Sequence, residues 1–339
     1  MTLTEPATIH SYTPKLYADV AQLIAAGPIT PPAPDIGLRR DGFGLFYREQ
    51  VNSLIGDPES GKTWLALVAA AERLFLNDSV LFIDLDHNGA QGVVSRLQAM
   101  GVKGEVLSNP QLFRFSEPED AVEIDGVVKD AKTWRPSLVI IDSLGELLPV
   151  YGASSNSADD FTRVHSRAIK PFATAGAAVV LIDHLAKGTD SRNYGATGTA
   201  AKKRAIGGTM LRVNCTEPFT PGTGGRAEII LAKDRHGGLR QVCPPGKEPL
   251  AAKFRLIDTN GALDWRIEAP DPGEMPTTPA SGKTTATLED DVASLEALDV
   301  APRSKADVTG RMGWGNDRAM VALREWRTRN AITPPVSPA

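Results

Sequence analysis

Residues 54–70 read LIGDPESGKTWLALVAA, and the segment from Gly56 to Thr63 fits the phosphate-binding pattern G-x-x-x-x-G-K-[ST]. An apolar strand at 51–55 and a following amphipathic helix form the context in which such a loop directs its N–H groups at phosphate. Lys62 is expected to pair with the β- and γ-phosphates of ATP, and Thr63 to bind Mg²⁺. The predicted nucleotide contacts are Gly56, Asp57, Pro58, Glu59, Ser60, Gly61, Lys62, Thr63 and Trp64.

Strand-like and helix-like runs alternate on both sides of this loop. Strands are predicted at 45–56, 79–86, 111–117, 137–143 and 177–184, and helices at 62–76, 90–100, 121–131 and 158–175. Such alternation is typical of a twisted parallel sheet flanked by helices, an α/β fold. Three later strands, at 226–235, 252–258 and 262–268, have little helix between them and are expected to extend the sheet in antiparallel fashion.

Proline-rich segments mark the expected domain boundaries. Residues 1–42 are predicted to hold a short helix at 15–26 and a linker, and residues 43–268 to form the nucleotide-binding domain. Residues 269–287 are rich in Pro, Thr, Gly and Ser and are predicted to be a flexible linker. A small helical domain is expected at 288–331, followed by a disordered tail at 332–339.

Composition describes an ordinary globular chain. Of the 339 residues, 42% are hydrophobic and 23% charged, and the formal net charge is −4. A nucleic-acid site would therefore have to be a local basic patch. No apolar run is long enough to span a membrane and the N-terminus lacks a secretory pattern, so a cytoplasmic protein without a membrane partner is expected. The two cysteines are interpreted as reduced thiols.

An apolar strand at 137–143 ends in Asp142, a second candidate for the phosphate site. A carboxylate at the tip of a buried parallel strand can hold the water shell of Mg²⁺, so Thr63 and Asp142 are the predicted metal ligands. The alternative is that Asp142 only caps the next helix. A second SGKT, at 281–284, lies in the linker with no strand before it and is interpreted as coincidental.

Together these residues resemble the RecA-like ATPases, and among them the hexameric helicases of the DnaB and plasmid RepA type, over residues 43–260. The resemblance implies that Asp86, in the place of a catalytic Glu, polarises the attacking water, although Asp is one methylene shorter. The weaker candidate is Asp84. The resemblance also implies that His184 senses the γ-phosphate. The alternatives are strand-end solvation for the acids and a surface or core role for the histidine.

In the same family, a strand ending in Lys-x-Arg reaches into the neighbouring subunit's nucleotide, and Lys233 and Arg235 fit that pattern. The segment between His184 and Gly207 resembles the loops that line the channel of a ring helicase and hold single-stranded DNA. Its predicted DNA contacts are Lys187, Arg192, Lys202, Lys203 and Arg204, with Tyr194 available for stacking. The alternative for Lys233 and Arg235 is a charge pair at the end of a strand, and the alternative for the segment after His184 is a solvated basic loop.

Residues 304–330 are similar to a helix-turn-helix. Val308 and Met312 are expected to close the first helix, Gly313 to permit the turn and Asn316 to cap the second helix, whose buried stripe is predicted to be Ala319, Met320 and Leu323. This small domain, helix-turn-helix or winged-helix-like, could contact duplex DNA. Arg318 is a candidate contact alongside Arg311, Arg324, Arg327 and Arg329. The alternative is a helical protein-binding module with a solvated basic face, and Trp314 and Trp326 are expected in its core.

Three hypotheses follow. The first is an oligomeric, DNA-translocating ATPase, a replicative helicase that forms a hexameric ring and uses ATP and Mg²⁺. The second is a RecA-like ATPase that does not unwind DNA, such as a helicase loader, a recombination accessory or a regulatory switch. The third is an ATP-sensing transcription regulator. A small-molecule kinase is disfavoured because the Asp142 strand comes two strands after the loop.

Overall fold

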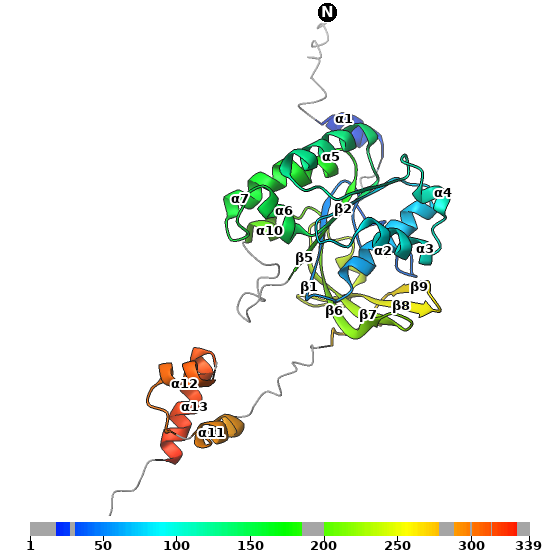
Figure 1. The fold of residues 1–339 in the computed structure, drawn as a ribbon. Helices are drawn as coiled ribbons and strands as arrows, with labels where there is room; N and C mark the ends of the chain where they lie inside the picture. Colours follow the sequence, from blue (N-terminus) through cyan, green and yellow to red (C-terminus); the bar gives the residue numbers. More distant parts are fainter. Residues whose placement is uncertain are drawn as a thin grey trace, which may run out of the picture. The chain divides into compact units, whose positions relative to one another are not determined.

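The computed structural model describes residues 18–27, 31–184, 200–277, 288–298, 300–312 and 314–330. The chain divides into two compact units, Met1–Pro276 and Thr277–Ala339, and each is described by itself (Figure 1). Within the described ranges, none of the helices combines the length and the apolar character that crossing a bilayer requires.

The first unit is built on a nine-stranded sheet in the order β3-β2-β4-β5-β1-β6-β7-β8-β9 (Figure 1). The strands are β1 (Val51–Gly56), β2 (Val80–Asp84), β3 (Phe113–Ser116), β4 (Leu138–Asp142), β5 (Ala178–His184), β6 (Thr209–Thr220), β7 (Gly224–Asp234), β8 (Leu250–Thr259) and β9 (Ala262–Glu268). The strands from β3 to β6 pair in parallel, and β6 to β9 pair antiparallel. The sheet is therefore mixed, with the expected antiparallel extension.

Helices cover both faces of the parallel part because alternate side chains along each strand are apolar on both sides. In β4, Leu138 and Ile140 join one hydrophobic cluster, while Val139 and Ile141 join the other. The first cluster packs against α2 (Lys62–Phe75), α3 (Ala90–Ala99) and α4 (Gly104–Leu107). The second packs against α5 (Ala121–Trp134), α6 (Leu144–Val150), α7 (Ala158–Val164), α8 (Lys170–Thr174) and α10 (Ala200–Ala205).

Several elements differ from the expectation. The first strand begins at Val51, and the residues before it form only an isolated bridge between Ile36 and Phe46. The helix predicted at 158–175 is interrupted by a π-turn, His165–Ile169. Strand β6, helices α4, α6 and α10 and the 3₁₀ turn Arg240–Val242 were not predicted. Helix α1 covers Val20–Ala25, and the start of the helix predicted at 15–26 falls outside the described residues.

The second unit consists of α11 (Leu288–Glu296), α12 (Lys305–Met312) and α13 (Asn316–Arg329). Its core contains Leu295, Val308, Ala319, Ala322 and Leu323, with Trp314 and Trp326 packed against it. Two details correct the sequence prediction: Gly315, not Asn316, is the N-cap of α13, and Met320 is 54% exposed because Ala319, Ala322 and Leu323 form the inner face. The described part of this unit contains no strand, so it shows no wing.

Candidate nucleotide-binding site

The loop between β1 and α2 adopts a conformation that depends on its glycines. Gly61, at the N-terminus of α2, has a φ of 96°. A Cβ on Gly61 would lie 2.4 Å from the ring of Phe219, and one on Gly56 would lie 2.6 Å from both Ser60 Oγ and the carbonyl oxygen of Val213. Both positions therefore require glycine, for backbone freedom at Gly61 and for space at both.

This loop holds a buried hydroxyl without a hydrogen-bond partner among the described residues, Ser60, and a cation two residues later, Lys62. Lys62 Nζ donates to the carbonyl oxygens of Gly56 and Asp57, at 3.1 and 2.7 Å. Burial lowers the pKa of Lys62, and the carboxylate of Asp142 partly opposes this effect. Ser60 Oγ is buried and has no hydrogen-bond partner among the described residues. A buried cation beside an unsatisfied donor fits an anionic group such as phosphate.

Asp142, at the end of β4, is held against the first turn of α2. Its Oδ2 accepts hydrogen bonds from Thr63 Oγ1 at 2.9 Å and from Asn88 Nδ2 at 3.2 Å. Burial, with a smaller contribution from the nearby charges of Asp86 and Asp84, raises the pKa of Asp142 to about 6 against the opposing hydrogen bond from Thr63. A carboxylate that is costly to ionise alone is suited to a partner with positive charge.

The turn after β2 places the two acids predicted there in different environments. Asp84 is buried, and its carboxylate accepts from Asn88 Nδ2 at 3.0 Å and from the backbone N–H groups of Asp86 and Gly89. Asp86 is exposed and lines the cavity above the loop. Asp84 therefore orders the turn, while Asp86 presents its carboxylate to the site.

These residues line a cavity of about 700 Å³ beside the loop. His184 belongs to it because β5 pairs with β1 in a register that sets His184 beside Gly56. Sequence reasoning missed further lining residues, among them Asn88, Arg96 and Phe219. The pattern around the loop gave no signal for them, since they enter from the turn after β2, from α3 and from the end of β6.

An apolar cavity of about 550 Å³ shares Trp64, Arg96 and Phe219 with the first. The guanidinium of Arg96 lies 4.9 Å from the centre of the Trp64 ring, and Phe219 stacks on Phe254 with ring centroids 5.8 Å apart. A flat ring bound here would meet aromatic and guanidinium faces.

Lys233 and Arg235 lie at the opposite end of the strands from the phosphate-binding loop, where the parallel strands begin. Because β7 is antiparallel to β6, Asp234 pairs with Thr209, and Arg235 N donates to the carbonyl oxygen of Gly208. Arg235 shares a cavity with Val51, at the start of β1. The phosphate-binding loop follows the other end of β1, and the length of this strand separates Val51 from the loop by about 17 Å. Lys233 Nζ donates to the carbonyl oxygens of Lys203, Arg204 and Ile206, which fastens the end of α10.

The predicted DNA contacts occupy different settings. Lys187 and Arg192, and also Tyr194, lie outside the described residues. Lys203 and Arg204 are exposed on α10. Lys202 corrects its prediction: its side chain is 3% exposed and forms an ion pair with Asp183 at 2.8 Å, so it is not presented to a DNA backbone. Arg318 donates to both carboxylate oxygens of Asp291, at 2.8 and 2.5 Å, and covers the Trp314 ring.

The site fits ATP with Mg²⁺ on its donor set. Mg²⁺ is usually held by one or two oxygen ligands of the protein together with substrate phosphates and waters. Thr63 Oγ1 and the Asp142 carboxylate, joined by a hydrogen bond of 2.9 Å, are oxygen donors of the kind that could hold it. The part of the chain that the structure describes holds no group of three or more His, Cys, Asp and Glu that could bind a metal without phosphate.

Comparisons with known proteins agree with this geometry. Residues 40–190 match the family model of an AAA domain. A RecA protein of Symbiobacterium thermophilum is 24% identical over 233 residues, which cover 65% of this chain and 62% of that protein. A RecA protein of Mycoplasmopsis pulmonis is 29% identical over 108 residues, covering 32% of this chain and 30% of that one. The chain thus spans less than two thirds of either relative.

A search of solved structures finds a KaiC-like protein of Pyrococcus horikoshii OT3, with a TM-score of 0.49 and 11% identity, over 70% of this chain and 99% of the other. The residues that match the family model include the strand, loop and helix that carry Lys62 and Thr63. The chain therefore contains a RecA-like P-loop ATPase domain.

Proposed function

We propose that this protein is an oligomeric ATPase that assembles its active sites between subunits and moves along single-stranded DNA, as a helicase of the RepA and DnaB type does. The observation that carries the proposal is the position of Arg235. Lys62 and Asp142 lie where the parallel strands end, and Arg235 lies at the opposite side, where the parallel strands begin. One chain therefore cannot bring both to the same nucleotide, whereas a head-to-tail neighbour can.

Within one subunit, Lys62 and the loop N–H groups bind the phosphates, and Thr63 and Asp142 hold Mg²⁺, which supplies charge neutralisation when bound. Asp86 orients the attacking water, since its exposed carboxylate faces the cavity from the turn that Asp84 fixes. His184 contacts the γ-phosphate from the tip of β5. The apolar cavity formed by Trp64, Arg96 and Phe219 takes the base.

The neighbouring subunit completes the site with Arg235, whose cation stabilises charge that develops on the transferred phosphoryl group. An arginine of this kind contributes about 10³–10⁵ in rate in other NTPases. Lys233 acts as a positioning residue, because its ammonium is already bound to three carbonyl oxygens of its own chain.

A mixing experiment tests the shared site. Lys62→Ala and Arg235→Ala should each be nearly inactive alone. In a one-to-one mixture, about one quarter of the interfaces join an intact Lys62 to an intact Arg235, so about one quarter of wild-type turnover should return. A mixture that stays inactive while the two variants still co-assemble would refute the shared site.

The DNA-binding part of the proposal is supported by α10. Lys203 and Arg204 are exposed there, while the buried pair of Lys202 with Asp183 joins this helix to the residue before His184. A change at the γ-phosphate can thus reach the basic helix through two adjacent residues. Turnover should rise when single-stranded DNA is added, and strand displacement should depend on ATP. Unchanged turnover at saturating DNA would exclude translocation.

A second candidate is an ATPase that does not unwind DNA and uses ATP as a conformational ligand. The observation that favours it is the acid in the turn after β2: Asp86 stands where the RecA-like ATPases that this chain resembles carry a Glu, and Asp is one methylene shorter. Slow turnover combined with nucleotide-dependent assembly would support this candidate, and robust strand displacement would exclude it.

A further inference from the structure

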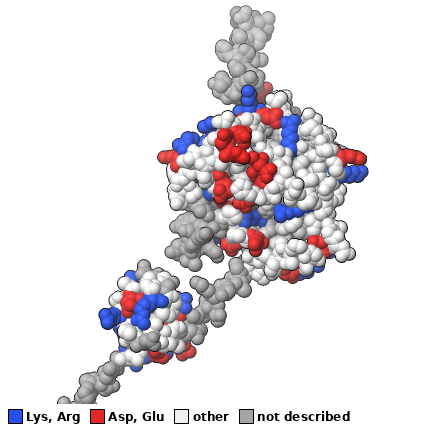
Figure 2. All heavy atoms as spheres, viewed as in Figure 1, with Lys and Arg blue, Asp and Glu red and all other residues white. Residues whose placement is uncertain are grey.

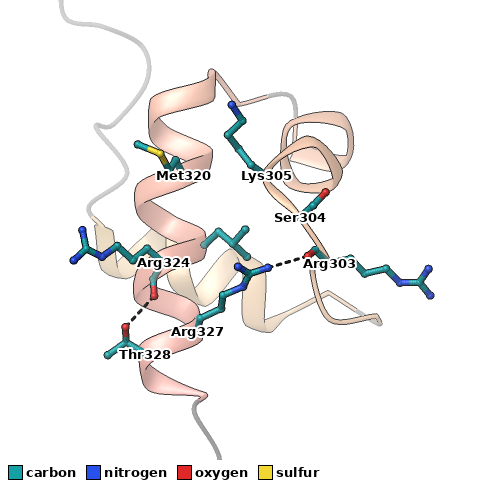
Figure 3. A pocket seen from close by; sticks show the side chains of 8 residues that line it. Arg303, Ser304, Lys305, Met320, Arg324, Arg327 and Thr328 are labelled. Carbon is teal, nitrogen blue, oxygen red and sulfur yellow. Dashed lines mark hydrogen bonds between the residues drawn. The ribbon is translucent and has the colours of Figure 1, made fainter.

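A groove on the second unit is lined by cationic side chains that take no part in the nucleotide site. It lies between the start of α12 and one face of α13, with a volume of about 790 Å³ (Figure 3). Figure 2 shows Lys and Arg side chains on the visible face of this unit, with acidic side chains among them. The groove is lined by Arg303, Ser304, Lys305, Met320, Leu323, Arg324, Arg327 and Thr328. Four of these side chains are cationic and none is acidic.

The cations of this groove differ from other arginines of the unit, which form ion pairs with carboxylates. Arg318 is paired with Asp291, Arg311 with Asp307 and Arg329 with Glu325. Among the described residues, the side chains of Arg303, Lys305 and Arg324 contact no carboxylate. Arg327 donates to the carbonyl oxygen of Arg303, which leaves its charge uncompensated (Figure 3). The positive potential of the unit is therefore concentrated in the groove.

Two rows of cations flank the groove. Lys305 is the first residue of α12 and Arg303 lies two residues before it, while Arg324 and Arg327, three residues apart, lie on one face of α13. All four are exposed. Among the apolar lining side chains Met320 is exposed and Leu323 is 5% exposed, so much of the apolar surface of the groove comes from the aliphatic parts of the cationic side chains. An amphipathic acidic helix docks through several apolar anchor side chains, and the groove exposes one apolar side chain to meet them, Met320, whereas a phosphate backbone needs only the cations.

The arrangement of the helices favours a duplex over a single strand. Residues 313–315 join α12 to α13, and a connection of this length is typical of a helix-turn-helix. Figure 3 shows α13 in the plane of the view and α12 close to end-on, so the two helices cross. No aromatic side chain lines the groove, although stacking on aromatic rings is the usual means of binding single strands.

We propose that this groove binds the phosphate backbone of duplex DNA through Arg303, Lys305, Arg324 and Arg327. The proposal goes beyond the ATPase function and does not depend on it. It also replaces Arg318 as the candidate contact, because Arg318 is held by Asp291 and Trp314 within the unit.

The test compares two arginines of the same helix in the full-length protein. Arg324→Gln removes an unpaired groove cation, and Arg329→Gln removes a cation already paired with Glu325, at equal cost in net charge. Binding of a fluorescein-labelled duplex of mixed sequence is measured by anisotropy over a series of salt concentrations, without nucleotide. Arg324→Gln should weaken binding about 3- to 10-fold and reduce the salt slope by about 1, and Lys305→Gln with Arg324→Gln should reduce it by about 2.

Arg329→Gln should leave affinity and slope close to wild type, and circular dichroism should show that all variants are folded. No binding of duplex, equal losses from Arg324→Gln and Arg329→Gln, or tighter binding of polyglutamate than of duplex would each overturn the proposal. A loss of affinity for single-stranded DNA with no loss of affinity for the duplex would overturn it too. Basal ATP turnover should persist in the groove variants, and Lys62→Ala should still bind duplex, so a failure here is distinct from a failure of the shared ATPase site.

Discussion

At the scale of single residues, Glu72 shows how an acid outside the site shapes stability. It lies on α2, and its Oε2 accepts a hydrogen bond from the N–H of Leu38 at 3.0 Å. Burial raises its pKa to about 7, against opposing hydrogen bonds from the backbone of Leu38 and Gly37. The folded protein therefore holds this proton at pH values where the unfolded chain has lost it, and stability falls as pH rises from about 4.5 to about 7.

Glu72→Gln should remove this cost while keeping an acceptor oxygen for Leu38. Above about pH 8, the free energy of unfolding should increase by about 2 kcal/mol, once the partial exposure of the side chain is allowed for. Below about pH 4 the two proteins should unfold alike, because both then carry a neutral side chain. Urea titrations at the two pH values measure this, and an equal difference at both would contradict it.

Gly61 combines backbone strain with a close contact, and Gly61→Ala should reveal both. Its φ of 96° and the ring of Phe219, 2.4 Å from the added Cβ, predict a loss of stability of about 1–3 kcal/mol. ATP binding should weaken by at least about tenfold, since the loop must shift. Gly42→Ala is the control: Gly42 has a φ of 87° and open space around its Cβ position. It should lose stability from strain alone and keep ATP binding.

At the scale of elements, α10 is fixed to the sheet from two sides. Lys202 reaches inward to Asp183 at the end of β5, while Lys233 reaches from β7 to the last carbonyl oxygens of the helix. The neighbouring Lys203 faces outward. One turn of helix thus carries a buried structural cation beside exposed ones.

Lys202→Met should destabilise the protein by about 3–5 kcal/mol because it leaves the Asp183 carboxylate buried and unpaired. Adding Asp183→Asn should recover much of this loss. Lys203→Met is the matched control, with native stability and, under the proposed function, weaker stimulation of turnover by single-stranded DNA. Denaturation and ATPase assays distinguish the two. A stable Lys202→Met that binds DNA poorly would show that Lys202 contacts DNA after all.

At the scale of the whole molecule, the separation of Arg235 from Lys62 makes turnover depend on assembly. Turnover per subunit should rise with protein concentration, in step with the oligomer fraction measured by sedimentation. Arg235→Ala should remain about 10³-fold slower at every concentration, yet bind fluorescent ATP as wild type does, because its own loop is intact. A monomer that hydrolyses ATP at full rate would contradict this.

Features that lie within a short stretch of chain were readable in the sequence. Gly56 to Thr63 contains the loop, its glycines and its cation in eight consecutive residues, and alternation of apolar runs predicted a helix-covered sheet with an antiparallel extension. Asp142 was also predicted, because the tips of parallel strands meet at one edge. The physical reason is that backbone geometry and strand direction follow from local pattern.

Only the tertiary structure decided which side chains meet across elements. Asn88, Arg96 and Phe219 reach the cavity from three separate segments, and no spacing rule links them to the loop. Lys202 and Lys203 are equally basic in sequence, yet only packing turns one to Asp183 and the other to solvent. The antiparallel pairing of β7 with β6 likewise placed Arg235 at the opposite end of the strands from Lys62. Burial and pairing of charges depend on contacts distant in sequence, which a local pattern does not contain.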